Sequence, residues 1–341
     1  MKENCGFVAY RLPHERHHHL CSISAISTRD SDINFSDFQF IFAPFDKSDN
    51  PAYLSKFSSK EIDGKIPNVN LKNGVLDGVS KEVYIETCQN LIDRITAEKV
   101  SKVILSRTQS IEDTDVDINA IFESMKFKYP DAFVYLLHHP DIGTWAAATP
   151  ELLLSKNDHL VSTVALAGTR KYNPIDTEPW GNKEVEEHKY IETYVNESLD
   201  RLKLKYTKSE TSTRRAGNVE HIESKYEITD TENQFIELID KLHPGPAISG
   251  YPPKEAIDII KNIESYDRKY YCGYLGPLDI NDQSMLYVNL RCMEIFSNGY
   301  KIYIGGGITK DSIAEDEWNE TILKSETMSD ILSSVNYEDH K

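Results

Sequence analysis

The sequence has little that would divide the chain, cross-link it or hold it in a membrane. No run rich in Pro, Gly and Ser interrupts the 341 residues, so we expect a single domain over residues 1–341. No apolar run approaches the roughly 20 residues of a membrane-spanning helix, and the N-terminus lacks the apolar core of a signal peptide. The five cysteines form no CxxC pair, which indicates reduced thiols rather than disulfides. Together these absences predict a cytoplasmic protein.

Positive charge is also scarce. The chain has 38 Lys and Arg against 55 Asp and Glu, a net charge of -17, which would repel nucleic acid and anionic membrane surfaces. We therefore expect neither as a partner, and the lack of an obvious exposed apolar helix favours a monomer. An anionic substrate would need a metal ion or a few well-placed Lys and Arg side chains.

Hydrophobic residues make up 39% of the chain, which is enough for a sizeable core. Their patterns predict helices and strands that come in blocks. Residues 80–99 repeat apolar side chains at steps of four, three and four, from Tyr84 to Ile95, which predicts an amphipathic helix. The run KVILSRTQSI predicts a strand, and AFVYLLHH, TWAAA, ELLLS and HLVSTVALAG predict an antiparallel meander.

The second half of the chain continues in blocks. Helices are predicted at 182–203, 229–242, 252–264 and from about 313, the last with a capping box from Ser312 to Glu315. The polar region 204–220 is expected to be a loop, and the apolar runs on either side of Ser-Asn-Gly near 298 predict a hairpin. Because strands and helices do not alternate regularly, the pattern indicates an α+β fold.

The last predicted helix carries DEWNETILK, in which Glu317, Glu320 and Lys324 share one face. A solvated face with an ion pair would explain them, but carboxylates also suit Mg²⁺ and a lysine suits an anionic ligand. Just before this helix, Gly305 and Gly307 belong to a glycine run that either forms a flexible turn or offers backbone amides to an anion.

A second acidic helix begins KEVEEH, with Glu184, Glu187 and His188 on one turn. Surface charge alone would explain this turn. If the two acidic helices converge, their glutamates could clamp one Mg²⁺ that keeps some of its waters.

Lys102 begins the run KVILS, with Ile104 and Ser106 expected on the same strand face. Glu151 begins ELLL. Ordinary strand positions would explain both residues, with the lysine snorkelling to solvent. A catalytic role would require burial to favour the neutral lysine and the protonated glutamate.

Taken in order, these segments resemble the chorismate-utilising enzymes, the family of the isochorismate, salicylate, anthranilate and aminodeoxychorismate synthases. The resemblance covers residues 80–330, and its landmarks are KVILSR, ATPELLL, ALAGTR, KEVEEH, NVEH, HPGPAISG, YDRKYYCGYLG, LR at 290–291, and GGGI followed by DEWNETILK. It implies an α+β fold of antiparallel sheets flanked by helices around a buried active site, with chorismate as substrate and Mg²⁺ as cofactor.

The resemblance also implies which residues hold the metal and the substrate. Glu187 and Glu320 would be the main Mg²⁺ ligands, supported by Glu317 and Glu184, and the ion would hold the ring carboxylate of chorismate. The ring carboxylate end would also meet Lys324 and the backbone at Gly168 and Thr169. The enolpyruvyl carboxylate would meet Tyr271, Arg291 and the backbone amides of Gly305 and Gly307. His221 would lie near the ring.

Within the family, the residue at position 102 separates the nucleophiles. Lysine there activates water in the isochorismate and salicylate synthases, whereas the anthranilate enzymes, which use ammonia, have glutamine. Ala167 stands where many aminodeoxychorismate synthases carry a nucleophilic lysine. The resemblance therefore implies that neutral Lys102 takes a proton from the water that attacks C2, while protonated Glu151 donates to the departing C4 hydroxyl.

Isochorismate synthase is the activity that this pattern implies, and two alternatives stay open. Salicylate synthases eliminate pyruvate from the same intermediate, but they resemble anthranilate synthases in having threonine where this chain has Ala247 or Ile248. A catalytically silent chorismate-binding subunit is the second alternative, although the expected catalytic groups are present. The product would enter menaquinone or siderophore synthesis.

Three features depart from the family pattern. Residues 1–80 match no part of it, Gly245 stands where threonine is common, and Glu184 stands where many relatives have aspartate. These departures bear on substrate access and metal affinity rather than on the class of reaction.

Overall fold

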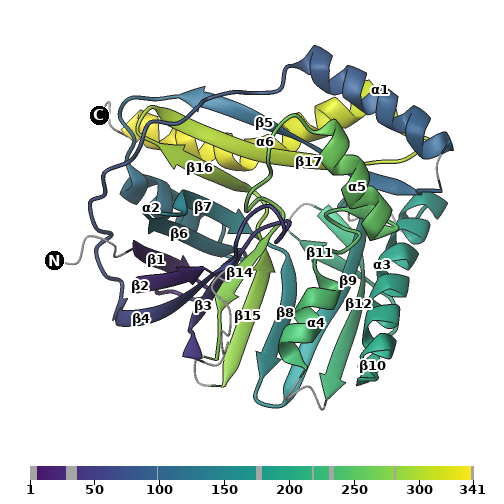
Figure 1. Ribbon diagram of the computed structural model, residues 1–341, viewed down its shortest axis with the longest axis horizontal. Coiled ribbons are helices and arrows are strands. Elements are labelled where there is room, and N and C mark those ends of the chain that lie inside the picture. The colour runs from purple at the N-terminus through teal and green to yellow at the C-terminus, as the bar shows by residue number, and fades with distance from the viewer. Residues whose placement is uncertain are drawn as a thin grey trace.

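A computed structural model describes residues 6–27, 37–97, 99–173, 179–216, 219–229, 234–279 and 282–338 (Figure 1). Within these ranges the helices are α1 (Lys81–Ala97), α2 (Ile118–Lys128), α3 (Asn182–Arg201), α4 (Phe235–Leu242), α5 (Pro253–Ile263) and α6 (Ala314–Glu338). The strands before α3 are β1 (Gly6–Arg11), β2 (His19–Ser27), β3 (Phe40–Ala43), β4 (Tyr53–Ile62), β5 (Lys102–Glu112), β6 (Phe133–His139), β7 (Gly143–Thr149), β8 (Leu152–Asn157) and β9 (Leu160–Lys171). Those after it are β10 (Lys205–Lys208), β11 (Ser212–Ala216), β12 (Val219–Thr229), β13 (Gly250–Tyr251), β14 (Tyr274–Pro277), β15 (Gln283–Val288), β16 (Cys292–Phe296) and β17 (Gly299–Ile308).

The strands pair antiparallel in one continuous network with two halves that meet at β4. The first half, here called the first sheet, runs β4-β2-β1-β6-β7-β16-β17-β5-β13. The second sheet runs β4-β3-β14-β15-β8-β9-β12, with β10 and β11 both paired to β12. The expected α+β fold of antiparallel sheets flanked by helices is confirmed.

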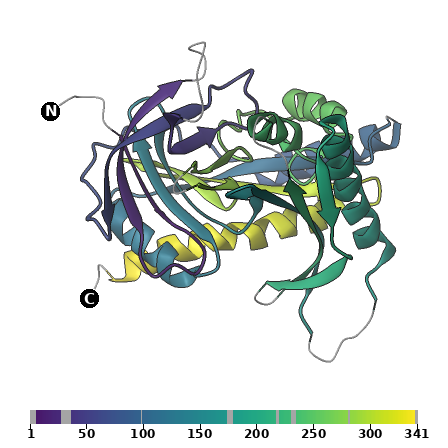
Figure 2. The same ribbon diagram turned by 90° about the horizontal axis from the view of Figure 1, so that it is seen from below.

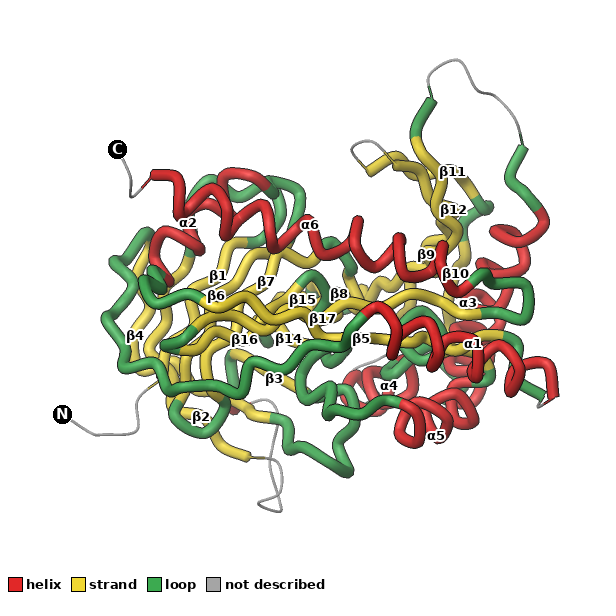
Figure 3. The backbone as a smooth tube through the Cα atoms, turned by 90° about the horizontal axis from the view of Figure 1, so that it is seen from above, coloured by secondary structure: helices red, strands yellow, loops and turns green. Residues whose placement is uncertain are grey.

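Three apolar layers hold the sheets and helices together. The largest lies between the two sheets and continues under α1 and α5. The second lies between the first sheet and the helices α2 and α6, and the third between the second sheet and the helices α3 and α4. Figure 3 shows α2 and α6 side by side along the strands, and Figure 2 shows α6 running beneath them. No described helix is long and apolar enough to cross a membrane.

Strand β6 shows why the sequence around it is almost continuously apolar. Phe133 and Tyr135 point into the layer between the sheets, where Phe133 stacks on Tyr287 of the second sheet with ring centroids 4.5 Å apart. Val134 and Leu136 point to the other face, into the layer under α2 and α6. Because both faces of the first sheet are covered, its strands lack the polar alternation of a half-exposed sheet.

Most of the elements expected from periodicity are present. α1 buries the predicted stripe, and α3 and α5 occupy nearly the predicted ranges. The strands β16 and β17 form the predicted hairpin.

Two expectations for the second half are wrong, and a third is only partly met. Residues 204–220 are largely strand rather than loop, because β10 and β11 pair with β12 and that pairing does not depend on an apolar pattern. The helix expected at 229–242 begins only at Phe235 in the described residues. The capping box is absent, since the Ser312 hydroxyl donates to Glu317 and the Glu315 carboxylate pairs with Lys81.

The predicted meander is split between the two sheets. β6 and β7 form a hairpin in the first sheet, and β8 and β9 form a hairpin in the second. The chain crosses from one sheet to the other at Pro150 and Glu151, immediately after Thr149. The Thr149 hydroxyl donates to the Val288 carbonyl at 2.6 Å, and the Val288 amide donates to the Glu151 carbonyl at 2.9 Å. These bonds fix the backbone of Glu151 at the junction of the sheets.

We predict that Phe133→Ala lowers the free energy of unfolding by about 3–5 kcal/mol, since it removes a fully buried ring between the sheets. The matched control is Phe127→Ala in α2, where the ring is 88% exposed and the expected change is within about 0.5 kcal/mol. Urea denaturation of both variants measures the difference. Equal effects would show that the layer between the sheets does not stabilise the fold.

Candidate active site

A cavity of about 1000 Å³ lies where β5 and β17 of the first sheet approach α3 and α6. It is lined by every residue expected at the site except Thr169, whose side chain lies outside the described residues. The expected residues on its wall are Lys102, Glu151, Gly168, Glu184, Glu187, His221, Ala247, Tyr271, Arg291, Gly305, Gly307, Glu317, Glu320 and Lys324. The two acidic helices therefore converge on one cavity, which meets the condition set for a shared metal site.

Lys102 is buried at the start of β5, with 6% of its surface exposed. Its ammonium group forms an ion pair with Glu187 of α3 instead of extending to solvent. The side chain crosses directly over β17, because a Cβ atom at Gly307 would lie 2.5 Å from the Lys102 Cε atom. Ile104 lines the same cavity, which confirms that it shares a strand face with Lys102.

The glycine run of β17 has a steric reason that the sequence did not reveal. A Cβ atom at Gly305 would lie 2.8 Å from the Tyr271 hydroxyl, so a side chain there would displace the tyrosine just as one at Gly307 would displace Lys102. The run is a strand paired with β5, not a flexible turn. Its glycines make room for two cavity side chains, while the anion-binding role of their amides stays a prediction.

Burial raises the pKa of Glu151, although the nearby cations Lys102, Lys324 and Arg291 act in the opposite direction. Desolvation outweighs these charges because protein atoms surround the carboxyl group on the cavity wall. The direction is the one that a general acid needs, since it keeps the proton on the group closer to neutral pH. The expectation that burial favours the neutral form of Lys102 stays a prediction.

The first turns of α6 present two carboxylates to one glycine of β17. A Cβ atom at Gly306 would lie 3.5 Å from Glu317 Oε2 and 3.7 Å from Glu320 Oε1. Burial raises the pKa of Glu317, whose carboxylate also accepts the Ser312 hydroxyl at 2.6 Å. Glu320 pairs with Lys324 at 2.6 Å, an i,i+4 bridge.

The carboxylates of α3 complete the acidic wall. Burial raises the pKa of Glu187, but the charge and hydrogen bond of Lys102 outweigh burial, so the pKa lies below its ordinary value. Glu184 also lines the cavity, next to Gly168. Among the described residues, no three His, Cys, Asp or Glu side chains are close enough to form a metal cluster by themselves.

Cations and a histidine face these carboxylates. The Lys324 ammonium donates to the Gly305 carbonyl at 3.0 Å, and the Arg291 guanidinium donates to the Thr327 hydroxyl at 2.8 Å. The His221 ring donates from Nδ1 to the Gly168 carbonyl at 3.1 Å, next to a bulge between β9 and β12. Gly168 has a φ of +65°, a conformation that favours glycine.

Several cavity residues were not anticipated. Lys183 precedes the predicted acidic turn of α3, and Lys310 lies in the connection between β17 and α6, so their neighbours in sequence could have indicated them. Leu290, from the LR landmark, also lines the cavity, as does Tyr190. Nothing in a single sequence distinguishes Tyr190 from an ordinary core residue.

Comparison with known proteins gives a consistent assignment. The family model described as chorismate binding enzyme matches residues 47–333. Isochorismate synthase EntC of Escherichia coli is 29% identical over 246 residues, which cover 69% of this chain and 63% of that protein. The chain thus spans less than two thirds of that relative.

Solved structures agree on the fold. The menaquinone-specific isochorismate synthase MenF of Escherichia coli superposes with a TM-score of 0.80 at 18% identity, covering 96% of this chain and 88% of the other. Anthranilate synthase component I of Streptococcus pneumoniae superposes with a TM-score of 0.71 at 17% identity, covering 96% and 92%. At these identities the likeness concerns the fold alone. Because the family model covers most of its length, the chain belongs to the chorismate-binding enzyme family.

Proposed function

We propose that the protein is an isochorismate synthase that converts chorismate to isochorismate with Mg²⁺. The observation that carries the proposal is the presence of a buried lysine, Lys102, and a carboxyl group with a raised pKa, Glu151, in one cavity with cationic and acidic walls. The similarity to isochorismate synthase EntC supports the same activity.

In the proposed mechanism, Lys102 in its neutral form removes a proton from a water molecule as that water attacks C2 of chorismate. Protonated Glu151 donates its proton to the C4 hydroxyl, which leaves as water while the double bonds shift between the two carbons. The two groups come from different segments, β5 and the crossing between the sheets. They can therefore act on different parts of one ring, which the cavity walls hold in place.

The charges on the walls suit a dicarboxylate. Arg291 and Tyr271 would bind the enolpyruvyl carboxylate, and Lys324 would bind near the ring carboxylate. The protein as a whole is strongly acidic, so these local positive groups and a metal ion meet the requirement set by the net charge.

The acidic wall fits Mg²⁺ by the chemistry of its donors. Glu187 and Glu320 would be the main ligands, with Glu317 and Glu184 in support, and all four offer the hard oxygen atoms that Mg²⁺ prefers. A closed protein cage is not needed, because Mg²⁺ usually keeps several waters and binds through one or two carboxylates plus its substrate. The bound ion would hold and orient the ring carboxylate.

The apolar wall formed by Ala247 and Ile248 favours isochorismate over salicylate as the product. Both residues line the cavity, and neither carries a hydroxyl group. Salicylate synthase is the second candidate, and the release of pyruvate would identify it.

We predict that the purified protein converts chorismate with Mg²⁺ to isochorismate, detected by chromatography. Salicylate with pyruvate would indicate the second candidate. Anthranilate formed on addition of ammonia would contradict the assignment of water as nucleophile. No turnover of any kind would refute the enzyme and favour a silent binding subunit.

We predict that Lys102→Gln and Glu151→Gln each lower kcat by about 10²–10⁴-fold, since each removes a proton-transfer group. In the wild type, activity should fall as pH rises through the raised pKa of Glu151, because the acid must be protonated to donate. The control is Lys156→Gln in β8, a lysine paired with Asp279 at 3.5 Å outside the cavity wall, which should keep normal kinetics. Near-normal kcat in either cavity variant would refute the mechanism.

We predict that a chelator abolishes turnover. Glu187→Gln and Glu320→Gln should each raise the Mg²⁺ concentration for half-maximal rate by at least about tenfold, which corresponds to a loss of roughly 1.4 kcal/mol in binding free energy. Glu315→Gln is the matched control, because Glu315 lies in the first turn of the same helix but pairs with Lys81. Full activity after chelation would contradict the metal site.

A further inference from the structure

Beyond the residues that face the cavity, a buried ion pair lies behind its wall. Arg268 and Glu264 follow α5, and each side chain is 3% exposed. The guanidinium donates from Nε to Glu264 Oε2 at 2.7 Å and from one terminal nitrogen to Oε1 at 2.6 Å. This two-point contact fixes the plane of the guanidinium as well as its position.

The pair of Arg268 and Glu264 supplies hydrogen bonds to the edge of β5 beyond its pairing with β13. β13 pairs with β5 only at Lys102 and Val103. Beyond that point Arg268 donates to the Ile104 carbonyl at 2.7 Å, and Glu264 accepts the Ser106 amide at 2.8 Å and the Ser106 hydroxyl at 2.7 Å. The ion pair therefore takes the place of a neighbouring strand directly after the segment that carries Lys102.

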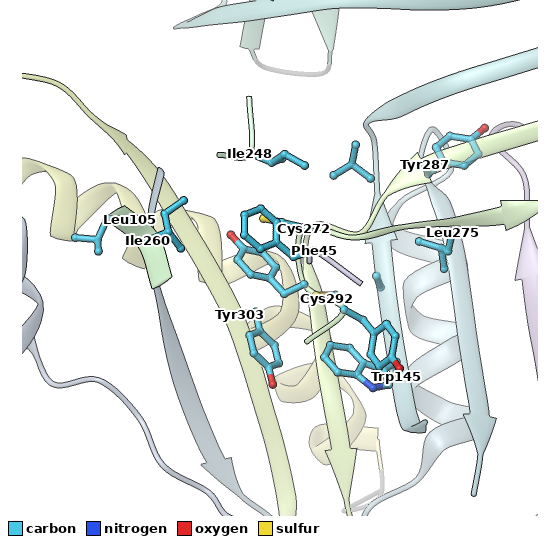
Figure 4. Close-up of a cluster of buried hydrophobic side chains, with 14 of the residues drawn as sticks. Phe45, Leu105, Trp145, Ile248, Ile260, Cys272, Leu275, Tyr287, Cys292 and Tyr303 are labelled. Atoms are coloured by element: carbon cyan, nitrogen blue, oxygen red, sulfur yellow. The ribbon is translucent and has the colours of Figure 1, made fainter. Parts of the chain in front are cut away.

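The same guanidinium reaches a second wall of the cavity. Arg268 donates to the Ile248 carbonyl at 3.0 Å, and Ile248 lies next to Ala247 on the apolar wall. The Arg268 carbonyl accepts the amide of Tyr271 at 2.9 Å. Figure 4 shows Phe45 and Cys272 close together with Ile248 above them, and the guanidinium packs 4.6 Å from the Phe45 ring centroid.

We propose that Arg268, held by Glu264, is a positioning residue that fixes the β5 segment of Lys102 relative to the Ala247–Ile248 wall and Tyr271. Its side chain does not line the cavity. The guanidinium acts through the backbone carbonyls of Ile104 and Ile248, and the backbone carbonyl of Arg268 accepts the Tyr271 amide. A small shift of Lys102 against the opposite wall would separate the base from the attacked carbon. The inference rests on the proposed function of the cavity.

Arg268→Lys tests the proposal, because lysine keeps the charge but cannot bond two carbonyls and a carboxylate in one plane. We expect kcat to fall about 10- to 100-fold per folded molecule, with KM changed by less than about threefold, since Arg291 and Lys324 still bind the substrate. Circular dichroism and thermal melts determine the folded fraction at the assay temperature.

Arg11→Lys is the matched control. Arg11 is also buried, and its guanidinium also donates to backbone carbonyls, those of Lys126, Tyr129 and Ala132, but it lies outside the cavity wall. This variant should lower Tm while its kcat and KM stay within about twofold of the wild type. The contrast separates positioning from a general loss of stability.

Ser106→Ala is the second variant, for use if Arg268→Lys does not fold. It keeps the ion pair but removes the hydroxyl contact with Glu264, and a smaller fall in kcat at normal KM would support the proposal. Normal kcat per folded molecule in Arg268→Lys, or in Ser106→Ala when only that variant folds, would overturn it. A wild type without any turnover would instead refute the proposed function, so the two failures are distinguishable.

Discussion

The ion pair between Lys102 and Glu187 joins the two halves of the structure across the cavity. Lys102 lies on β5 of the first sheet, and Glu187 lies on α3, which covers the second sheet. A buried charge without its partner is strongly destabilising, so this contact constrains both elements at once. The other carboxylates and cations line the same cavity, where negative groups lie near positive groups.

Room for these charged groups comes from the backbone around them. The glycines of β17 leave space for Lys102 and Tyr271, and the crossing at Pro150 carries Glu151 from one sheet to the other. Behind the wall, the pair of Arg268 and Glu264 supplies hydrogen bonds where no strand continues β13. Lys102 and Arg268 can be held in the protein interior because each has a carboxylate partner.

Periodicity predicted the helices well where each helix buries one apolar face, as α1 and α3 do. It failed for β10 and β11, which carry few apolar side chains and are defined by pairing with β12. The expected capping box at Ser312 failed because that hydroxyl found a side-chain partner, Glu317, on the first turn of the helix. The strand pairing, and the ion pair that draws Glu315 to Lys81, come from tertiary geometry that local patterns do not encode.

The sequence alone determined which chemical groups are available and in what order. The ordered motifs sufficed to indicate the family and fourteen of the residues that line the cavity. Only the tertiary structure decided that Lys102 pairs with Glu187, that burial raises the pKa of Glu151, and that the glycine run clears space for side chains rather than forming a turn. The physical reason is that pairing and desolvation depend on distances between residues far apart in the chain. Those distances are set by the packing of the two sheets and their helices, which no local pattern specifies.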